Sequence, residues 1–219
     1  MKEPNTQPHL DLAAVRIDYA KRSLDERDVD PDPIRQLIAW IDQAIAARVN
    51  EPNAMTLATC EDGRPSARVM LLKNVDADGL SFFTNYLSRK GRQMAANPQV
   101  AAVMWWPELE RQVRIEGTVS RTTIEESRDY FAKRPPDARL GAVASPQSEI
   151  VESRRQLEGR MAELRHQYPD GNIPCPEHWG GFRLRPRRME FWQGRPSRLH
   201  DRIEYLRENN AWTIRRLAP

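Results

Sequence analysis

The sequence predicts a mainly β protein with flanking helices, of the α+β class, in which an antiparallel sheet curls into a barrel. Between Ala54 and Arg121, five apolar segments of strand length follow one another, and turn residues such as Asp62-Gly63 and Asp78-Gly79 join the first three. Such short links suit antiparallel neighbours, because a parallel pair needs a long crossover. In addition, no G-x-G-x-x-G sequence follows a strand, so a dinucleotide-binding parallel fold is not supported.

Strands and helices can be assigned along most of the chain. The strands are expected at Ala54–Cys60, Pro65–Asn74, Leu80–Asn85, Gln99–Trp106 and Arg111–Arg121, with three more between Phe182 and Pro219. Helices are expected around Leu12 to Ser23, after Asp32-Pro33 with Ile34, Leu37, Ile38, Ile41 and Ile45 as the apolar stripe, near Ser88, from Thr123 to Arg134, and from Ser153 to Tyr168. Residues 1–30 are polar and irregular, so we expect a mobile N-terminal arm followed by a single domain over residues 31–219.

Composition excludes several classes of protein. Of the 219 residues, 39% are hydrophobic and 30% charged, with a net charge of +3, which gives no sign of a nucleic-acid partner. No apolar run is long enough to span a membrane, and the N-terminus lacks the apolar core of a signal peptide, so no membrane association and a cytoplasmic location are expected. Cys60 and Cys175 lie far apart without metal-type partners, which predicts neither a disulfide framework nor a metal site.

Three polar residues near the C-terminus, Arg198, His200 and Arg202, stand at alternate positions. On a β-strand this spacing puts them on one face, whereas on a helix His200 would point away from the two arginines. Two cations that flank a group titrating near neutrality suit an anionic ligand that exchanges protons or electrons. A solvated strand face is the competing interpretation of this motif taken alone.

Two earlier segments combine cations with apolar residues. In RVMLLK (68–73), Arg68 and Lys73 are five residues apart, so a bulge or a strand end is needed for both to reach one ligand, unless they contact different ligands. In FFTNYLSRK (82–90), a strand leads into a helix that begins with Ser88, Arg89 and Lys90, which is typical of a phosphate site. A buried strand with charged ends and an ordinary Ser N-cap are the plainer alternatives.

Amides and aromatic residues complete the pattern. Gln112, Gln147 with Ser148, and Trp192 suit the polar edge and the face of a heterocycle such as a flavin ring, although each alone is uninformative. No Cys–His or Ser–His–Asp arrangement is evident among only four histidines, which disfavours a hydrolase or a His-rich metal site. The remaining pattern fits a phosphorylated cofactor bound beside a phosphorylated substrate.

Segments spread along the chain match one known family in its own order. They are RVMLLK (68–73), FFTNYLSRK (82–90), LERQVRIEG (109–117), YFAKRP (130–135), SPQS (145–148), HWGGFR (178–183), FWQG (191–194), RLHDR (198–202) and the terminal RLAP. On these segments the chain resembles the pyridoxine (pyridoxamine) 5′-phosphate oxidase family, and the first 50 residues fit more loosely through Arg16 and Tyr19. The resemblance implies a split β-barrel of the FMN-binding type and a homodimer with FMN at the subunit interface, where both chains contribute to each site.

The resemblance also implies which residues form each site. From one subunit FMN would contact Arg68, Val69, Met70, Leu71, Leu72, Lys73, Phe83, Thr84, Ser88, Arg89 and Lys90. From the other subunit it would contact Gln112, Gln147, Ser148, Trp192 and Arg202. The substrate would contact Arg16, Tyr19, Lys73, Tyr130, Arg134, Ala138, Arg198 and His200. Arg198 and His200 would be the catalytic pair that faces its pyridine ring, and Lys73 would serve the substrate while Arg68 serves FMN.

The implied reaction oxidises pyridoxine or pyridoxamine 5′-phosphate to pyridoxal 5′-phosphate. Hydride passes from the substrate C4′ to flavin N5, and O2 then reoxidises the flavin and yields H2O2. The amine substrate also releases ammonia. In this scheme the flavin carries the redox chemistry, and the protein supplies position and charge.

Two positions depart from the family pattern. Ala138 stands where a serine usually contacts the substrate phosphate, and one lost hydrogen bond to a charged group costs about 1.5–3 kcal/mol. Phe83 stands where a tyrosine is common. Ala138 leaves open a related FMN oxidase acting on another ring-shaped metabolite, and a non-catalytic carrier of flavin or pyridoxal phosphate is a further alternative. A group of four arginines near residue 185 raises the alternative of nucleic-acid binding, but a solvated edge strand explains the group better. The four are Arg183, Arg185, Arg187 and Arg188.

Overall fold

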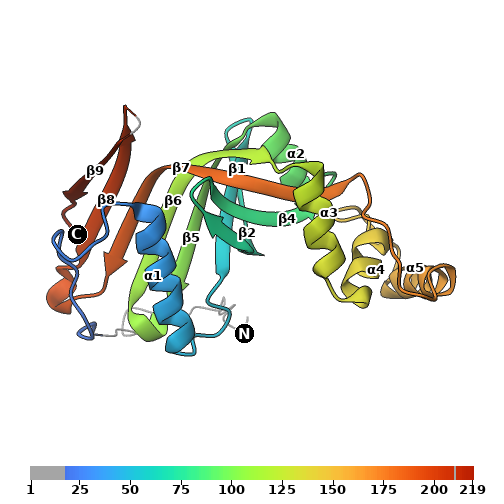
Figure 1. Ribbon diagram of the computed structural model, residues 1–219, viewed down its shortest axis with the longest axis horizontal. Coiled ribbons are helices and arrows are strands. Elements are labelled where there is room, and N and C mark those ends of the chain that lie inside the picture. The colour runs from blue at the N-terminus through green and yellow to red at the C-terminus, as the bar shows by residue number, and fades with distance from the viewer. Residues whose placement is uncertain (1–17, 210) are drawn as a thin grey trace, which may run out of the picture.

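The computed structural model describes residues 18–209 and 211–219, which form an antiparallel sheet with helices packed beside it (Figure 1). The strands are β1 (Ala54–Glu61), β2 (Arg64–Leu71), β3 (Asn74–Asp76), β4 (Gly79–Asn85), β5 (Gln99–Trp106), β6 (Arg111–Arg121), β7 (Trp179–Gln193), β8 (Asp201–Glu208) and β9 (Ala211–Arg216). The helices are α1 (Pro33–Ala46), α2 (Arg89–Ala96), α3 (Ile124–Lys133), α4 (Pro136–Ala144) and α5 (Arg154–Gln167). Two 3₁₀ turns, η1 (Pro107–Leu109) and η2 (Pro196–Arg198), follow β5 and β7.

The strand order is β2-β1-β5-β6-β7-β4-β3, with β8 paired to β7 and β9 paired to β8. The long strand β7 organises this sheet, because its first half pairs with β4, its second half pairs with β8, and β6 runs along its other edge. Among the described strands, β2 and β3 do not pair with each other, so the sheet is open. The mainly β, antiparallel class is confirmed, and closure into a barrel stays a prediction.

A bulge divides β7 between its two halves. The β6–β7 register shifts after Glu116, so that Gly117 faces Pro186 and the next residue of β7 has no partner. Proline lacks the N–H that a regular ladder needs, which explains its place at the irregularity. A Cβ on Gly117 would lie 2.1 Å from the Arg185 carbonyl oxygen, so only glycine fits opposite.

The four arginines of β7 lie on an interior strand, because β7 has neighbours on both sides. The expectation that they lie on a solvated edge strand is wrong. Arg183, for example, donates hydrogen bonds to Asp78 (3.0 Å) and Glu126 (2.6 Å), so it is neutralised within the fold. Arg188 is likewise paired with the buried carboxylate of Glu204.

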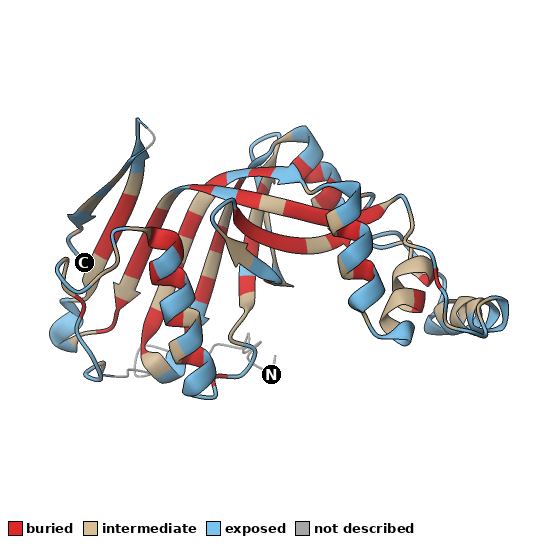
Figure 2. Cartoon of the chain, in the orientation of Figure 1, coloured by how far each residue is buried: buried red, intermediate tan, exposed pale blue. Residues whose placement is uncertain are grey.

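Two apolar clusters stabilise the molecule (Figure 2). The larger lies between α1 and the sheet and includes Trp40, Leu57, Phe191 and Tyr205, each at most 2% exposed. The smaller consists of Phe131, Leu140, Ile173 and Trp179, and it joins α3 and α4 to the start of β7. This second cluster fixes the helices that border the candidate site.

Local sequence explains how α1 begins, but its inward face differs from the expected stripe. The Asp32 carboxylate accepts a hydrogen bond from the Ile34 amide (2.9 Å), and Pro33 occupies the first turn, where its missing N–H costs nothing. Trp40 packs edge-on against Phe191 with ring centroids 5.1 Å apart. This contact turns Ile34, Leu37, Trp40 and Ala44 inward, so the expected burial of Ile38 and Ile45 is wrong.

Three further expectations need correction. Half of the predicted helix at Leu12–Ser23 lies outside the described residues, and residues 18–23 are not helical. The predicted strand Pro65–Asn74 is interrupted, because β2 ends at Leu71 and residues 74–76 form β3. Helix α4 was not predicted. Pro135-Pro136 was expected only to end the previous helix, but Pro136 also occupies the first turn of a new one.

None of the helices in the described ranges is both long enough and apolar enough to cross a membrane.

Candidate functional site

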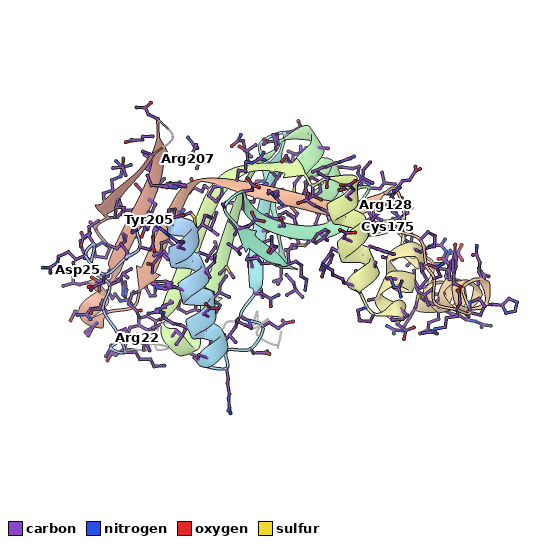
Figure 3. The ribbon with its side chains drawn as sticks, viewed as in Figure 1. Arg22, Asp25, Arg128, Cys175, Tyr205 and Arg207 are labelled. Carbon is purple, nitrogen blue, oxygen red and sulfur yellow. The ribbon has the colours of Figure 1, made fainter. Side chains whose placement is uncertain are left out.

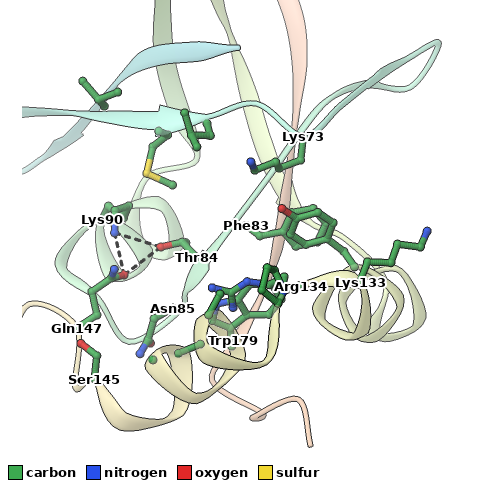
Figure 4. Close-up of a pocket in the computed structure, with 18 of the residues that line it drawn as sticks. Lys73, Phe83, Thr84, Asn85, Lys90, Lys133, Arg134, Ser145, Gln147 and Trp179 are labelled. Atoms are coloured by element: carbon green, nitrogen blue, oxygen red, sulfur yellow. Dashed lines mark hydrogen bonds between the residues drawn. The ribbon is translucent and has the colours of Figure 1, made fainter. Parts of the chain in front are cut away.

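A cavity of about 880 Å³ opens between β2, β4, α3 and α4 (Figure 4). Many of the residues predicted to bind cofactor or substrate line it, namely Val69, Met70, Leu71, Lys73, Phe83, Thr84, Lys90, Tyr130, Arg134, Ala138 and Gln147. Among the described residues its charged lining is strongly cationic, with Lys73, Lys90, Lys133 and Arg134 against a single carboxylate, Glu51. Such a cavity favours an anionic ligand.

Lys73 reaches the cavity because β2 ends before it. The Leu72 amide donates to the Asn53 carbonyl (2.8 Å) and the Lys73 amide to the Ser81 carbonyl (2.9 Å), so the chain leaves β2 and turns toward β4. The strand end that the spacing of Arg68 and Lys73 required is therefore present. Leu72 is 4% exposed and packs in the core, so its side chain does not line the cavity.

Lys90 lies at the cavity wall among neutral partners. Its ammonium group donates to Thr84 Oγ1 (3.1 Å) and to Gln147 Oε1 (2.9 Å), as the dashed lines of Figure 4 show. Burial, followed by the charge of Arg68, lowers the pKa of Lys90 to about 8. Gln147, which the resemblance assigned to the other subunit, thus contacts Lys90 of its own chain, a correction that follows from the path of the chain after α4.

Arg68 does not line the cavity but lies close behind it. Its guanidinium donates to neutral oxygens only, those of Leu57, Thr59, Ser66 and Gln93, at 2.8 to 3.1 Å. Burial and then the charge of Arg89 lower its pKa. Arg68, Arg89 and Lys90 therefore form a group of cations near one another, and no carboxylate within the described residues forms a salt bridge with any of them.

Ser88 has a structural task. Its hydroxyl caps α2 by accepting from the Gly91 amide (3.3 Å), donates to the Asn85 carbonyl (2.7 Å), and is fully buried. It does not line the cavity, so the sequence-based assignment of a direct ligand contact has no geometric support. Ser148 is exposed and lies outside the lining as well, although its neighbour Gln147 is part of it.

The far wall of the cavity is a stack of parallel rings. Phe83 stacks on Tyr130 with centroids 4.0 Å apart and an interplanar angle of 17°, and Trp179 continues the stack beside Phe83 at 5.6 Å. The Arg134 guanidinium carbon lies 4.8 Å from the Trp179 ring centroid. Burial lowers the pKa of Arg134, and among the described residues its buried Nη1 has no hydrogen-bond partner. The guanidinium lines the cavity, where it is suited to bind a phosphate or carboxylate.

The remaining predicted residues form a second group on other elements. Tyr19 contacts Trp192 and His200 with ring centroids 5.7 and 5.8 Å apart, and Trp192 and His200 lie 4.6 Å apart. His200 Nδ1 accepts a hydrogen bond from the Arg195 amide (3.1 Å), so the neutral ring carries its proton on Nε2. Burial, then the charge of Arg198, lowers the pKa of His200.

The strand register brings three of the predicted residues, Gln112, Trp192 and Arg202, into one row with Trp105. Trp105, Gln112, Trp192 and Arg202 are directly opposite one another on β5, β6, β7 and β8, so their side chains share one face of the sheet. Arg202 is held in this row by two hydrogen bonds to the buried carboxylate of Glu190, at 2.9 and 3.0 Å. Trp105 is 44% exposed, so a large apolar ring is in contact with solvent on this face of the sheet.

The expectation that Arg198, His200 and Arg202 share one strand face is wrong. β8 begins only at Asp201, and Arg198 belongs to η2, where it and Ser197 have positive φ angles of 60° and 56°. The turn therefore replaces strand geometry before His200. Arg16 lies outside the described residues.

The two groups lie at opposite ends of β7. Trp179, its first residue, lines the cavity, whereas Trp192, near its last, contacts His200. At about 3.3 Å per residue, the path along β7 between these two tryptophans is roughly 40 Å. Figure 1 shows β7 crossing the molecule from the α3–α4 end to the end that carries β8. Within one chain the two groups therefore lie near the two ends of β7.

Several lining residues were missed by sequence reasoning, namely Glu51, Asn85, Lys133, Ser145 and Trp179, together with Trp105 in the row described above. Asn85, Lys133, Ser145 and Trp179 belong to matched segments, but no role was assigned to them. Glu51 carries no local signal, and Trp105 is identified only by register. Within the described ranges, no group of three or more His, Cys, Asp or Glu side chains is arranged to hold a metal ion.

The chain matches two sequence models of one family. That of pyridoxamine 5′-phosphate oxidase covers residues 41–168, and that of the pyridoxine 5′-phosphate oxidase C-terminal dimerisation region covers residues 179–219. The pyridoxine/pyridoxamine 5′-phosphate oxidase of Burkholderia orbicola is 55% identical over 95% of this chain and 99% of its own length. The corresponding protein of Trichormus variabilis is 54% identical, covering 95% of this chain and 98% of its own length.

Solved structures extend the comparison to the fold. PhzG from Burkholderia lata, crystallised with tetrahydrophenazine-1-carboxylic acid, superposes with a TM-score of 0.87 at 33% identity, covering 91% of this chain and 99% of PhzG. A pyridoxamine 5′-phosphate oxidase-related, FMN-binding protein of Nostoc punctiforme shares the fold, with a TM-score of 0.69 at 20% identity over 86% of this chain and 98% of its own. The chain belongs to the pyridoxine/pyridoxamine 5′-phosphate oxidase family.

Proposed function

We propose that this protein is an FMN-dependent oxidase that converts pyridoxine or pyridoxamine 5′-phosphate to pyridoxal 5′-phosphate with O2 as acceptor, and that it acts in the cytoplasm as a homodimer with shared sites. The observation that carries the proposal is the cationic cavity, in which two separate sets of basic residues line or border one space. Family membership and relatives named for this activity support it.

The residues present fit FMN. The cations Arg68, Arg89 and Lys90 have no acidic partner among the described residues, and Lys90 also contacts the Thr84 hydroxyl. Such a group of cations and a hydroxyl suits a phosphate monoester. Apolar side chains next to them, Met70 and Leu71, would cover part of a ring system. When bound, FMN would supply the redox chemistry by taking two electrons from the substrate and passing them to O2.

The substrate phosphate would be bound by the second set of cations. Lys73, Tyr130 and Arg134 line the cavity, and no carboxylate in the described part of the chain forms a salt bridge with Lys73 or Arg134. Binding both phosphates at fixed points would orient the two rings toward each other, which is the main contribution a protein makes to such a reaction.

Arg198 and His200 would act on the ring end of the substrate. Because His200 Nδ1 accepts from the Arg195 amide, its Nε2–H is a donor that can orient a substrate oxygen or nitrogen. Since these residues lie roughly 40 Å along β7 from the cavity of their own chain, a second copy must bring them to it. The match of residues 179–219 to a dimerisation region supports this arrangement.

The test is spectroscopic. We expect the purified protein to be yellow, to release FMN on denaturation, and to lose its flavin absorbance when pyridoxine 5′-phosphate is added without O2. Admission of O2 should restore the absorbance and yield H2O2 and pyridoxal 5′-phosphate.

Arg134→Ala should raise KM by about tenfold or more, while Arg154→Ala, which changes an exposed arginine of α5, should behave as the wild type. A colourless protein that does not bind FMN would refute the proposal, and flavin binding without peroxide would indicate a carrier.

A second candidate keeps the flavin and changes the substrate. Ala138, Gly141 and Ala142 give α4 a face of small residues along the cavity, which leaves room for a substrate larger than a single pyridine ring. The 33% identical PhzG was crystallised with a tricyclic carboxylic acid. Oxidation of a dihydro- or tetrahydrophenazine carboxylate without turnover of either B6 phosphate would favour this candidate.

A further inference from the structure

Glu110 is a buried carboxylate with no basic side chain bonded to it among the described residues. It is 5% exposed and follows η1 in a left-handed conformation with φ of 55°. Its Oε2 accepts two backbone hydrogen bonds, from the amides of Ala20 and Lys21, each at 3.0 Å. These donors lie about 90 positions earlier in the chain, so Glu110 ties the N-terminal segment to the sheet.

The backbone carbonyl of Glu110 bonds to a different segment, the end of β7 and the loop that follows it. Its carbonyl oxygen accepts from the Gly194 amide (2.8 Å) and from Gln193 Nε2 (3.2 Å). Gly194 starts the loop that leads to His200. One residue therefore contacts both the N-terminal segment and the loop before the catalytic pair.

Tyr19 lies directly beside this contact. It is adjacent to Ala20, and its ring packs against Trp192 and His200. A Cβ on Gly194 would lie 2.7 Å from Tyr19 Cβ and Cγ, so the ring fits there only because residue 194 is glycine. A second carboxylate, Asp201, accepts from the Leu24 amide (3.0 Å) and fixes the segment further along. Figure 3 places Arg22 and Asp25 of this segment at the end of the molecule opposite Arg128 and Cys175.

We infer that Glu110 is a positioning residue that holds Tyr19 over His200 and Trp192, and so closes the ring end of the substrate site. It acts through the two backbone bonds to residues 20 and 21 and does not itself contact the substrate. This inference rests on the proposed function for its kinetic consequence, but the tether is a property of the protein without substrate.

The test combines digestion and kinetics on the full-length FMN-loaded protein. Trypsin can cut after Lys21 and Arg22, which are exposed but lie within the tethered segment. Glu110→Ala should speed this cleavage about tenfold or more and raise KM about tenfold, with kcat changed less than about twofold. Glu110→Gln keeps one acceptor oxygen and should restore most of both properties.

Matched variants separate positioning from general damage. Glu108→Gln changes an exposed carboxylate of the same turn and should leave cleavage and kinetics unchanged. In Tyr19→Ala with Glu110→Ala, KM should be no higher than in Tyr19→Ala alone, because both changes remove the same contact. If Glu110→Ala does not fold, Gly194→Ala displaces Tyr19 while retaining the carboxylate, and it should raise KM without faster loss of structure on heating.

Unchanged cleavage in Glu110→Ala, or additive effects of the Tyr19 and Glu110 changes on KM, would overturn the inference. If neither B6 phosphate is oxidised, the proposed function fails, whereas the digestion still decides whether Glu110 holds the segment.

Discussion

At the scale of single residues, the charge on Lys90 should govern ligand binding most directly. Its ammonium group contacts only neutral oxygens, and burial with the nearby Arg68 lowers its pKa to about 8. The group is therefore mostly protonated at pH 7 and loses its charge as the pH rises above about 8. A phosphate binds the charged form more strongly, so affinity should fall on the alkaline side.

The prediction concerns FMN affinity as a function of pH. Between about pH 7 and 9.5 we expect the dissociation constant of FMN, measured by the recovery of flavin fluorescence on release, to rise about tenfold. Lys90→Arg keeps its charge throughout this range and should bind FMN with little dependence on pH. A wild-type affinity that stays constant to pH 9.5 would show that Lys90 does not contact the phosphate.

At the scale of elements, α3 connects local sequence to the site. It begins with a capping box, in which the Glu126 amide donates to Thr123 Oγ1 (3.0 Å) and the Thr123 amide to Glu126 Oε2 (2.8 Å). The bond from the Thr123 amide is the largest cause that lowers the pKa of Glu126. At the other end of the helix, Tyr130 and Arg134 reach the cavity. The cap thus stabilises the helix from the end distant from the ligand.

Thr123→Ala should therefore affect stability and leave the chemistry intact. We expect the free energy of unfolding to fall by about 1 kcal/mol, with KM and kcat near the wild-type values. Urea denaturation at one fixed protein concentration measures the change, since the midpoint of an oligomer depends on concentration. Thr123→Ser keeps the Oγ acceptor and should recover most of the loss. A large rise in KM with no loss of stability would mean that the cap positions Tyr130 or Arg134 directly.

The elements also show what local sequence can predict. β5, β6 and the cap of α3 were predicted because alternation, turn residues and capping residues act over a few positions. The Arg198–His200 turn was not predicted, because its geometry depends on positive φ angles at Ser197 and Arg198, which residue spacing cannot reveal. The row that joins Trp105 to Gln112 and Trp192 requires the register of four strands. Most of the site residues were located through the family resemblance, and the contact of Gln147 with Lys90 needed the path of the chain after α4.

At the scale of the whole molecule, the length of β7 decides how the site is assembled. Trp179 and Trp192 lie near opposite ends of this 15-residue strand, with the bulge at Pro186 between them. The cavity residues and the His200 group are each held by hydrogen bonds of their own, such as Lys90 to Gln147 and the Arg195 amide to His200. Under the proposed function, a two-fold symmetric pair of chains would join the cavity of each copy to the His200 group of the other, so that two identical sites form at once.

Mixing two impaired variants, assayed at substrate concentrations well below the KM of either variant, tests this assembly. Arg134→Ala damages the cavity group and His200→Ala damages the other, so each homodimer should have two defective sites. A mixed dimer places both damaged halves in one site and leaves the second site intact. With random pairing, half of the dimers are mixed, so co-expression should restore about one quarter of the wild-type activity, and isolated mixed dimers about one half. If all groups of a site came from one chain, mixing would restore nothing. Two variants within the same group, Arg134→Ala and Tyr130→Ala, supply the control, because no pairing of these chains produces an intact site.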